Sequence, residues 1–258
     1  MHMKKTILFI LHVFFVSNLF SQSNQLSIKI GAAKTFAAPS GTSEGFAFKN
    51  ISVTYPYPTL AVEYAWGKKK KTNVDFYAGV SFQPIWYNGT FNYKNVKPGS
   101  LSFTTSSGFY APMLYTGADI KVRKAKKVMP AYKNYFFITV GGGLCLAGID
   151  KNEHTGFQVQ SYGMTYDNKI IMGGEMLLKR AQLPIAPTVF GGIRYHITNS
   201  KGKPVVVLEL IANYGITRYI DYAVQYEIDN QHKEDRLGEK GINIQLNVII
   251  PIHAFKKK

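Results

Sequence analysis

Alternation of apolar and polar residues recurs eight times along this chain of 258 residues, and it constrains the fold more than any other feature. A period of two residues is typical of β-strands that have one apolar face. The pattern is cleanest near the end of the chain, where Asn243, Gln245 and Asn247 alternate with isoleucine, leucine and valine. The eight runs are 26–33, 60–66, 74–82, 110–120, 136–146, 188–197, 205–214 and 242–250. The sequence therefore predicts an all-β protein.

The runs also have the length of membrane-crossing strands, since a tilted strand needs about 9–11 residues to cross a hydrocarbon layer. After the first residues the chain holds no apolar run as long as a spanning helix requires. The linkers alternate between short (67–73, 121–135, 198–204) and long, as in outer-membrane barrels with short periplasmic turns and long outer loops. We therefore predict an eight-stranded antiparallel up-and-down transmembrane β-barrel.

Two of the long linkers carry strand-like segments of their own. Residues 90–93 are predicted to pair with 100–104 across a Lys-Pro-Gly turn, and 157–166 with 169–172 across an Asp-Asn turn. Both hairpins are expected to project beyond the membrane. The alternative is that the second hairpin spans the membrane and makes ten strands. Eight is preferred, because 157–176 is broken by glycines and alternates poorly.

The N-terminus has the layout of a secretory signal peptide. Lys4 and Lys5 precede an apolar run at 7–16, and small and polar residues follow. We expect residues 1–22 to be removed and residues 23–258 to form the barrel domain. The single cysteine, Cys145, rules out a disulfide within the chain and a zinc centre built from cysteines.

The chain is strongly basic, with a net charge of +16, and the basic residues gather on the predicted short linkers. These linkers carry the lysines at 68–71, five cations within 121–127, and Lys201 and Lys203, and three lysines end the chain. Secretion and this placement argue against nucleic acid as a partner. The expected partners are outer-membrane lipid and lipopolysaccharide, the barrel assembly machinery, and an acidic periplasmic partner at the basic turns.

Charged residues also lie on the faces opposite the apolar ones, where they would point into the barrel. An eight-stranded barrel is just wide enough for its inward side chains to fill it. These residues therefore predict either a plug of mutually paired ions or an ion path or gate, and the plug is preferred because unpaired buried charges are costly. The residues of this predicted lumen charge network are Lys29, Glu63, Asp75, Asp119, Arg194 and Glu209.

Two predicted outer linkers hold polar clusters. Glu227, Asp229, Glu234 and Asp235 form a candidate cation-binding loop, although no glycine stands where a twelve-residue calcium loop needs one. Asp150, Glu153 and His154 place acids beside a histidine, a pairing with which hydrolases activate water. A solvated loop is the preferred interpretation of both clusters. We therefore expect no metal centre, no cofactor and no catalytic residue.

Several segments resemble the small outer-membrane β-barrel proteins of Bacteroidota-type bacteria. The sequence pattern of the strands resembles that of OmpA-type transmembrane barrels. The segments are the Lys-Lys start with its apolar run ending in Ser21 and Gln22, LSIKIGAA at 26–33, FGGIRYHI at 190–197 and INIQLNVII at 242–250. The resemblance implies an integral β-barrel protein of the cell outer membrane. Beyond what the resemblance implies, we expect a protein that is not an enzyme and that serves envelope structure, surface interaction or a narrow pore.

Two other functions stay open at this point. The first is a secreted soluble β-barrel with inverted faces that binds an apolar ligand inside. The second is an outer-membrane hydrolase, which would depend on His154 or His232.

Overall fold

The computed structural model describes fourteen segments of the chain, and every structural statement below refers to them. They are 24–36, 39–40, 46–50, 56–66, 73–93, 102–124, 133–146, 157–158, 164–166, 169–180, 185–199, 203–218, 220–228 and 231–252. The predicted signal peptide lies outside these residues. Within the described segments, no helix is long and apolar enough to cross a membrane.

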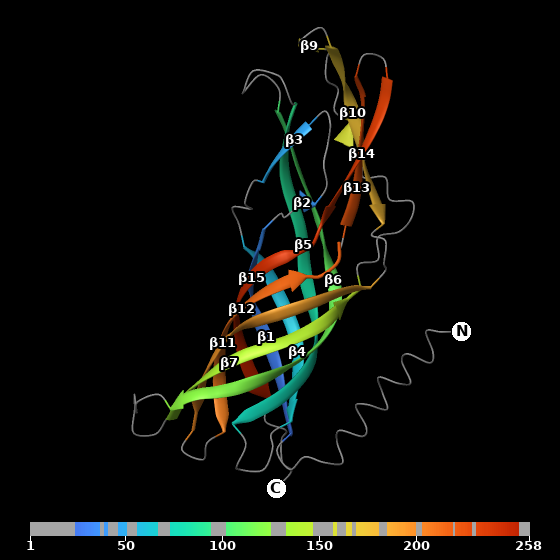
Figure 1. The fold of residues 1–258 in the computed structure, drawn as a ribbon. Helices are drawn as coiled ribbons and strands as arrows, with labels where there is room; N and C mark the ends of the chain where they lie inside the picture. Colours follow the sequence, from blue (N-terminus) through green and yellow to red (C-terminus); the bar gives the residue numbers. More distant parts are fainter. Residues whose placement is uncertain are drawn as a thin grey trace, which may run out of the picture.

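Eight antiparallel strands form a closed barrel (Figure 1). Each strand pairs with the next of the eight along the chain, and the last pairs with the first, so the sheet has no open edge. The predicted eight-stranded up-and-down topology is confirmed. The strands are β1 (Asn24–Phe36), β4 (Tyr57–Trp66), β5 (Val74–Tyr93), β6 (Ser102–Lys124), β7 (Lys133–Cys145), β11 (Ala186–Thr198), β12 (Pro204–Gly215) and β15 (Ile242–Ile252).

The ten-strand alternative is wrong, because the second predicted hairpin belongs to a different sheet. That hairpin does form, with β9 (Met164–Tyr166) paired to the start of β10 (Lys169–Arg180). However, β10 pairs with β13 (Ile220–Ile228) and with β8 (Phe157–Gln158), and none of these strands enters the ring. The second sheet is completed by β14 (Gln231–Glu239) and β2 (Pro39–Ser40).

Two strands of the barrel are much longer than predicted. β5 has 20 residues and β6 has 23, and the two pair without a register shift from Val74↔Ile120 to Asn92↔Ser102. The predicted pairing of 90–93 with the segment after 100 is therefore confirmed, as a continuation of the spanning strands rather than a separate hairpin. The short strand β3 (Phe46–Asn50) pairs with the far end of β5.

The register places the short linkers at one end of the barrel. Asn24 at the start of β1 lies opposite Trp66 at the end of β4, and Leu26 lies opposite Ile252 at the end of β15. The strand ends at 66, 124 and 198, which precede the short linkers, therefore share one end. The strands β3, β9, β10, β13 and β14 lie toward the opposite end (Figure 1). The predicted segregation of short and long linkers is confirmed, and we call the two ends the short-linker end and the long-linker end.

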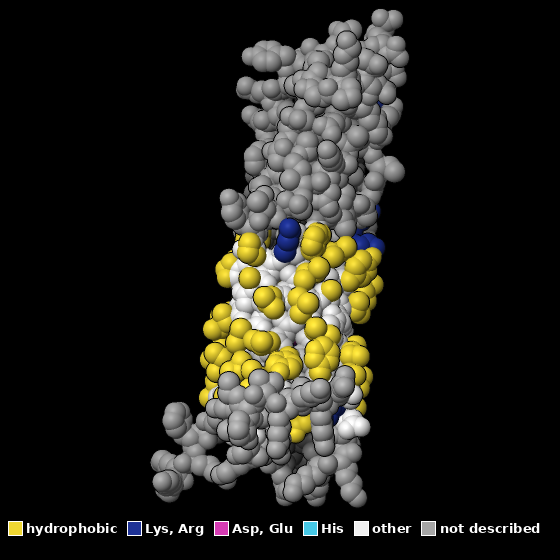
Figure 2. Space-filling model, turned by 90° about the vertical axis from the view of Figure 1, so that its left-hand side faces the viewer, with side chains coloured by type: hydrophobic (Ala, Val, Ile, Leu, Met, Phe, Trp, Pro, Cys, Tyr) yellow, Lys and Arg dark blue, Asp and Glu magenta, His cyan; other side chains and the backbone are white. Residues whose placement is uncertain are grey.

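The two faces of the barrel wall have opposite polarity. On the face that Figure 2 shows, hydrophobic side chains form a band across the outside of the barrel, with Lys or Arg side chains at its upper limit. In β15, Ile244, Leu246 and Val248 are 44%, 64% and 39% exposed, whereas Asn243, Gln245 and Asn247 between them are at most 4% exposed. Pro251 continues this alternation, paired with Ser27. This orientation contradicts the soluble alternative, which needs an apolar interior.

Candidate functional site: the charged layer of the lumen

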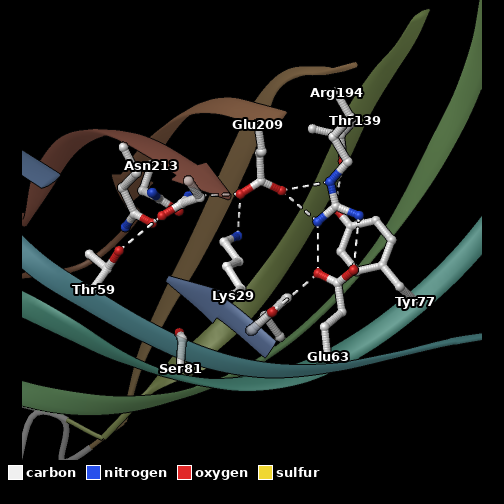
Figure 3. Close-up of polar contacts among 12 residues, drawn as sticks. Lys29, Thr59, Glu63, Tyr77, Ser81, Thr139, Arg194, Glu209 and Asn213 are labelled. Carbon is white, nitrogen blue, oxygen red and sulfur yellow. Dashed lines mark hydrogen bonds and ion pairs between the residues drawn. The ribbon is translucent and has the colours of Figure 1, made fainter. Parts of the chain in front are cut away.

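Arg194 of β11 is buried in the lumen and binds three carboxylates, of which Figure 3 shows Glu63 and Glu209. Its Nε donates to Glu209 Oε2 at 2.6 Å, and its Nη2 lies 2.5 Å from the same oxygen. Nη2 donates to Glu63 Oε2 at 2.7 Å, and Nη1 donates to Glu63 Oε1 at 3.0 Å and to Asp119 Oδ2 at 3.0 Å. The planar guanidinium thereby uses its fixed fork of donors to join three strands that are far apart in sequence.

The strand register explains why these residues meet. Arg194 and Glu209 are directly opposite each other on neighbouring strands β11 and β12. Glu63 on β4 and Asp119 on β6 lie at inward positions of other strands. Their side chains reach Arg194 because an eight-stranded barrel has an interior only as wide as its side chains.

A second cation, Lys29 of β1, completes the layer by an ion pair with Glu209 Oε1. The same oxygen accepts a hydrogen bond from Asn247 Nδ2 at 2.8 Å. Glu63 Oε2 also accepts one from the Tyr115 hydroxyl, at 3.2 Å. The side chains of Lys29, Glu63, Asp119, Arg194 and Glu209 are all at most 7% exposed. We call these five residues the charged layer.

Aromatic rings pack against the charged layer. The Arg194 Cζ atom lies 3.9 Å from the centre of the Tyr77 ring, a cation–π contact. The Tyr77 hydroxyl shares a hydrogen bond of 2.5 Å with Thr139 Oγ1. Space for the neighbouring ring of Tyr115 comes from Gly79, where an added Cβ would lie 2.6 Å from that ring. Large and small residues thus alternate across the lumen so that the layer is filled.

An amide layer follows the charged layer toward the long-linker end. Asn243 Oδ1 accepts hydrogen bonds from Asn213 and from Gln245, each at 2.9 Å, and Gln245 also donates to Gln83. Thr59 donates to Asn247 Oδ1 at 2.9 Å. In the sequence, the asparagines and the glutamine of β15 stand out only as the polar half of an alternating pattern. Their amide chemistry on a predicted inward face was the available signal that they would bond to one another.

Five of the six predicted lumen residues belong to the charged layer, and Asp75 does not. Asp75 occupies an inward position of β5 directly opposite Asp119 in the register, but it lies near the short-linker end and is only half-buried. Lys121 lies near Asp75 at this end of the lumen, and its Nζ atom is 3.9 Å from the centre of the Tyr135 ring. Asp75 therefore sits at the opening of the lumen rather than at its centre.

The other predicted site residues lie on the second sheet or outside the described residues. Glu227 lies on β13, and Glu234 and Asp235 lie on β14, so the candidate cation-binding loop is for the most part a β-hairpin. Asp229 lies outside the described residues, as do Asp150, Glu153 and His154. Among the described residues, no group of three or more His, Cys, Asp or Glu side chains is arranged to hold a metal ion.

Comparison with solved structures finds outer-membrane barrels. The chain is similar to the outer membrane protein OprG from Pseudomonas aeruginosa, with 7% identity, a TM-score of 0.37 and coverage of 91% of this chain and 98% of that one. It is similar to the outer membrane protein AlkL in lipid bilayers, with 13% identity, a TM-score of 0.40 and coverage of 92% and 94%.

A third similar structure is the transport unit of the autotransporter AIDA-I from Escherichia coli, with 11% identity, a TM-score of 0.26 and coverage of 90% and 91%. No protein-family model matches the chain, and no curated protein matches it either. With TM-scores this low, the fold described above rests on the strand pairing itself.

Proposed function

We propose that this chain is an integral outer-membrane β-barrel protein with a closed lumen. The protein is not an enzyme, and its barrel holds additional β-strands at the cell surface. The observation that carries the proposal is the inverted polarity of the barrel wall. Large apolar side chains cover its outside, whereas its inside holds the charged and amide layers together with buried hydroxyl, aromatic and a few aliphatic side chains. Such a wall is stable only where hydrocarbon, rather than water, surrounds the protein.

The two ends support an orientation. Outer-membrane barrels have short turns in the periplasm and longer extracellular loops. The short-linker end is therefore assigned to the periplasm and the long-linker end to the cell exterior. The paired extensions of β5 and β6 and the separate sheet of β10, β13 and β14 would then stand outside the cell, where they are available for surface interaction.

The closed lumen favours a structural or binding role over conduction. Arg194, Glu63 and Glu209 are each at most 3% exposed and bridge the interior from β4 to β11 and β12. A steady ion path through this level would have to separate those ion pairs. A narrow pore remains the second candidate function, because Asn247 connects the charged layer, through Glu209, with Thr59 in one continuous polar network.

Two measurements on the full-length protein test the proposal. The purified protein should require detergent to stay in solution, and its gel mobility should shift on heating, as for a barrel with a lipid-facing belt. In planar bilayers it should show no steady conductance. A compact monomer in detergent-free buffer would contradict the membrane assignment, whereas steady ion-selective openings would replace the closed lumen with the narrow pore.

The proposal also includes the export of the protein and the family to which the chain belongs. Residues 1–22 are proposed to direct secretion and to be removed, which the mass of the mature protein measures. The textural resemblance to barrels of Bacteroidota-type bacteria is proposed to reflect the family of the chain. Insertion would then depend on the barrel assembly machinery, and depletion of that machinery should leave the protein in the periplasm.

Anionic lipid is the proposed partner at both rims. At the periplasmic rim the basic short linkers would face phospholipid headgroups or an acidic periplasmic protein. At the outer rim Lys34 is exposed on β1, and Lys240 donates to the Tyr214 hydroxyl at 3.3 Å beside β15. Because β1, β15 and β12 are neighbours, both lysines lie in one sector of the wall, placed to contact lipopolysaccharide phosphates. Replacing both by glutamine should weaken lipopolysaccharide binding, while Lys203→Gln at the opposite end should not.

A further inference from the structure

The charged layer holds one more negative charge than positive charge. It contains the cations Lys29 and Arg194 and the carboxylates Glu63, Asp119 and Glu209. All five side chains are buried, so solvent does not screen the imbalance. A buried charge without a partner is strongly unfavourable, and in proteins it is usually relieved by binding a proton or another ion.

The excess charge lies at Asp119. Glu209 contacts both cations and Asn247, and Glu63 accepts two hydrogen bonds from Arg194 and one from Tyr115. Asp119 binds Arg194 through Oδ2 alone, and its buried Oδ1 atom has no hydrogen-bond partner among the described residues. Asp119 is therefore the least compensated carboxylate of the layer.

A proton acceptor without a partner lies beside this carboxylate. His196 follows Arg194 by two residues on β11, and its Nε2 atom is 3.7 Å from Asp119 Oδ2. This Nε2 atom is also buried without a hydrogen-bond partner in the described part of the chain. The imidazole ring of His196 packs at a tilt against the ring of Phe137, and the two ring centroids are 4.2 Å apart. The imidazole is thus held in place next to the carboxylate.

We propose that Asp119 and His196 together form a binding site for one proton, which makes the charged layer neutral. The proton converts the 3.7 Å contact into a hydrogen bond, either from the carboxylic acid to Nε2 or from the imidazolium to the carboxylate. In both forms one added proton gives His196 Nε2 a hydrogen-bond partner and cancels the excess charge of the layer. The site rests on the lumen geometry alone, and only the side from which the proton arrives depends on the proposed function.

The residues around Asp119 and His196 determine from which end of the barrel a proton can reach the site. His196 lies on the short-linker side of Arg194, between Arg194 and the end of β11 at Thr198, so the proposed orientation makes the site accessible from the periplasm and closed to the cell exterior by the Arg194 bridges. The titratable and charged groups at inward positions around the pair come from seven strands. They are Lys29 of β1, Glu63 of β4, Asp75 and Tyr77 of β5, Lys121 of β6, Tyr135 of β7, Arg194 of β11 and Glu209 of β12.

The proposal predicts that unfolding near neutral pH releases one proton. In the unfolded chain an aspartate is ionised and a histidine is mostly neutral above about pH 7. The folded state therefore binds one more proton than the unfolded state, and stability must fall as the pH rises until the site empties. For one proton the folding equilibrium constant falls about tenfold per pH unit.

The experiment compares denaturant unfolding of the barrel in detergent micelles between about pH 7 and pH 9. Asp119→Asn makes the layer neutral without a proton, so it should remove the tenfold dependence that the wild type shows. Asp75→Asn is the matched control, since Asp75 lies opposite Asp119 in the register but outside the charged layer, and it should keep the wild-type dependence. Equal pH dependence in wild type and Asp119→Asn would overturn the proposal.

A second measurement covers the case in which Asp119→Asn does not fold. The wild-type protein at neutral pH should show either the infrared band of a buried carboxylic acid or the nitrogen NMR signature of a charged His196. Absence of both signals would overturn the proposal. Stability that is independent of pH but rises with the concentration of one alkali cation would also overturn it, in favour of a bound metal ion. Each of these failures would leave the detergent requirement, and hence the proposed location, unchanged.

Discussion

The outer and inner faces of the same strands obey different rules. On the outside of β15, Ile244, Leu246 and Val248 contribute by apolar area, and one aliphatic residue can replace another. On the inside, Asn243, Gln245 and Asn247 each bind particular atoms on other strands. The outer face therefore places the barrel in a membrane, whereas the inner face specifies which side chains must be present together. Substitutions should separate these two roles.

The largest effect is expected when Arg194 is truncated. Arg194→Ala leaves Glu63, Asp119 and Glu209 buried with Lys29 as the remaining cation of the layer. Removing one partner from a buried ion-pair network typically costs about 3–5 kcal/mol. The free energy of unfolding in micelles, from urea titration, should fall by this amount, and the yield of folded barrel should fall with it.

The matched test of this prediction removes negative charge together with Arg194. Glu63→Gln combined with Arg194→Ala should restore part of the lost stability, because fewer unpaired carboxylates stay buried. Arg194→Lys should be intermediate, since an ammonium cannot reproduce the bidentate contact with Glu63. If Arg194→Ala were as stable as the wild type, the inner face would be as tolerant as the outer face.

A charge on the outer face should have a smaller effect that depends on depth. Leu246 is the most exposed large apolar residue described, at 64%, and it lies at the middle of β15. Leu246→Arg should cost about 2–4 kcal/mol, as for a cation near the bilayer midplane. Ile252→Arg, at the strand end, should cost about 1 kcal/mol or less. Equal losses at both positions, measured by unfolding in lipid vesicles, would argue against a hydrocarbon belt.

A methyl group tests how tightly the lumen is filled. Gly79→Ala places a Cβ 2.6 Å from the Tyr115 ring and 2.6 Å from the Val62 carbonyl oxygen, so the wall or the ring must shift. A loss of about 1–3 kcal/mol is expected from this overpacking. At Gly191 the nearest atom would be 3.9 Å away, so Gly191→Ala should be close to neutral. Thermal unfolding of the two variants in the same detergent measures the difference.

The topology of the barrel could be predicted because each of its causes is local in sequence. A period of two defines a strand and its faces, and linker length defines which ends share a side. For the same reason Glu63 and Arg194 could be assigned to the interior from their neighbours alone. The length of β5 and β6 could not, because their outer halves are fixed by pairing with each other rather than by an apolar belt.

The contacts inside the lumen could not be predicted from the pattern. Alternation gives the face of a residue but not its height, which depends on the register of every strand between two positions. The pattern therefore groups Asp75 with Asp119, although Asp75 is the second residue of β5 and lies at the mouth of the lumen. Alternation predicts that Tyr77 is on the inward face of β5, but not that its ring lies against Arg194, because this contact joins two strands that are not neighbours in the barrel.

The smallest expected effect concerns the hydroxyl group of Tyr77. Tyr77→Phe keeps the ring under Arg194 but removes the hydrogen bond to Thr139, so it should cost about 1 kcal/mol. Thr139→Val should cost a similar amount, since each single change leaves one buried polar group unpaired. The double variant leaves neither group, and its loss should therefore be smaller than the sum of the two single losses. Strictly additive losses in unfolding free energy would mean that the two hydroxyls do not depend on each other, and the inner face would then be less specific than its contacts indicate.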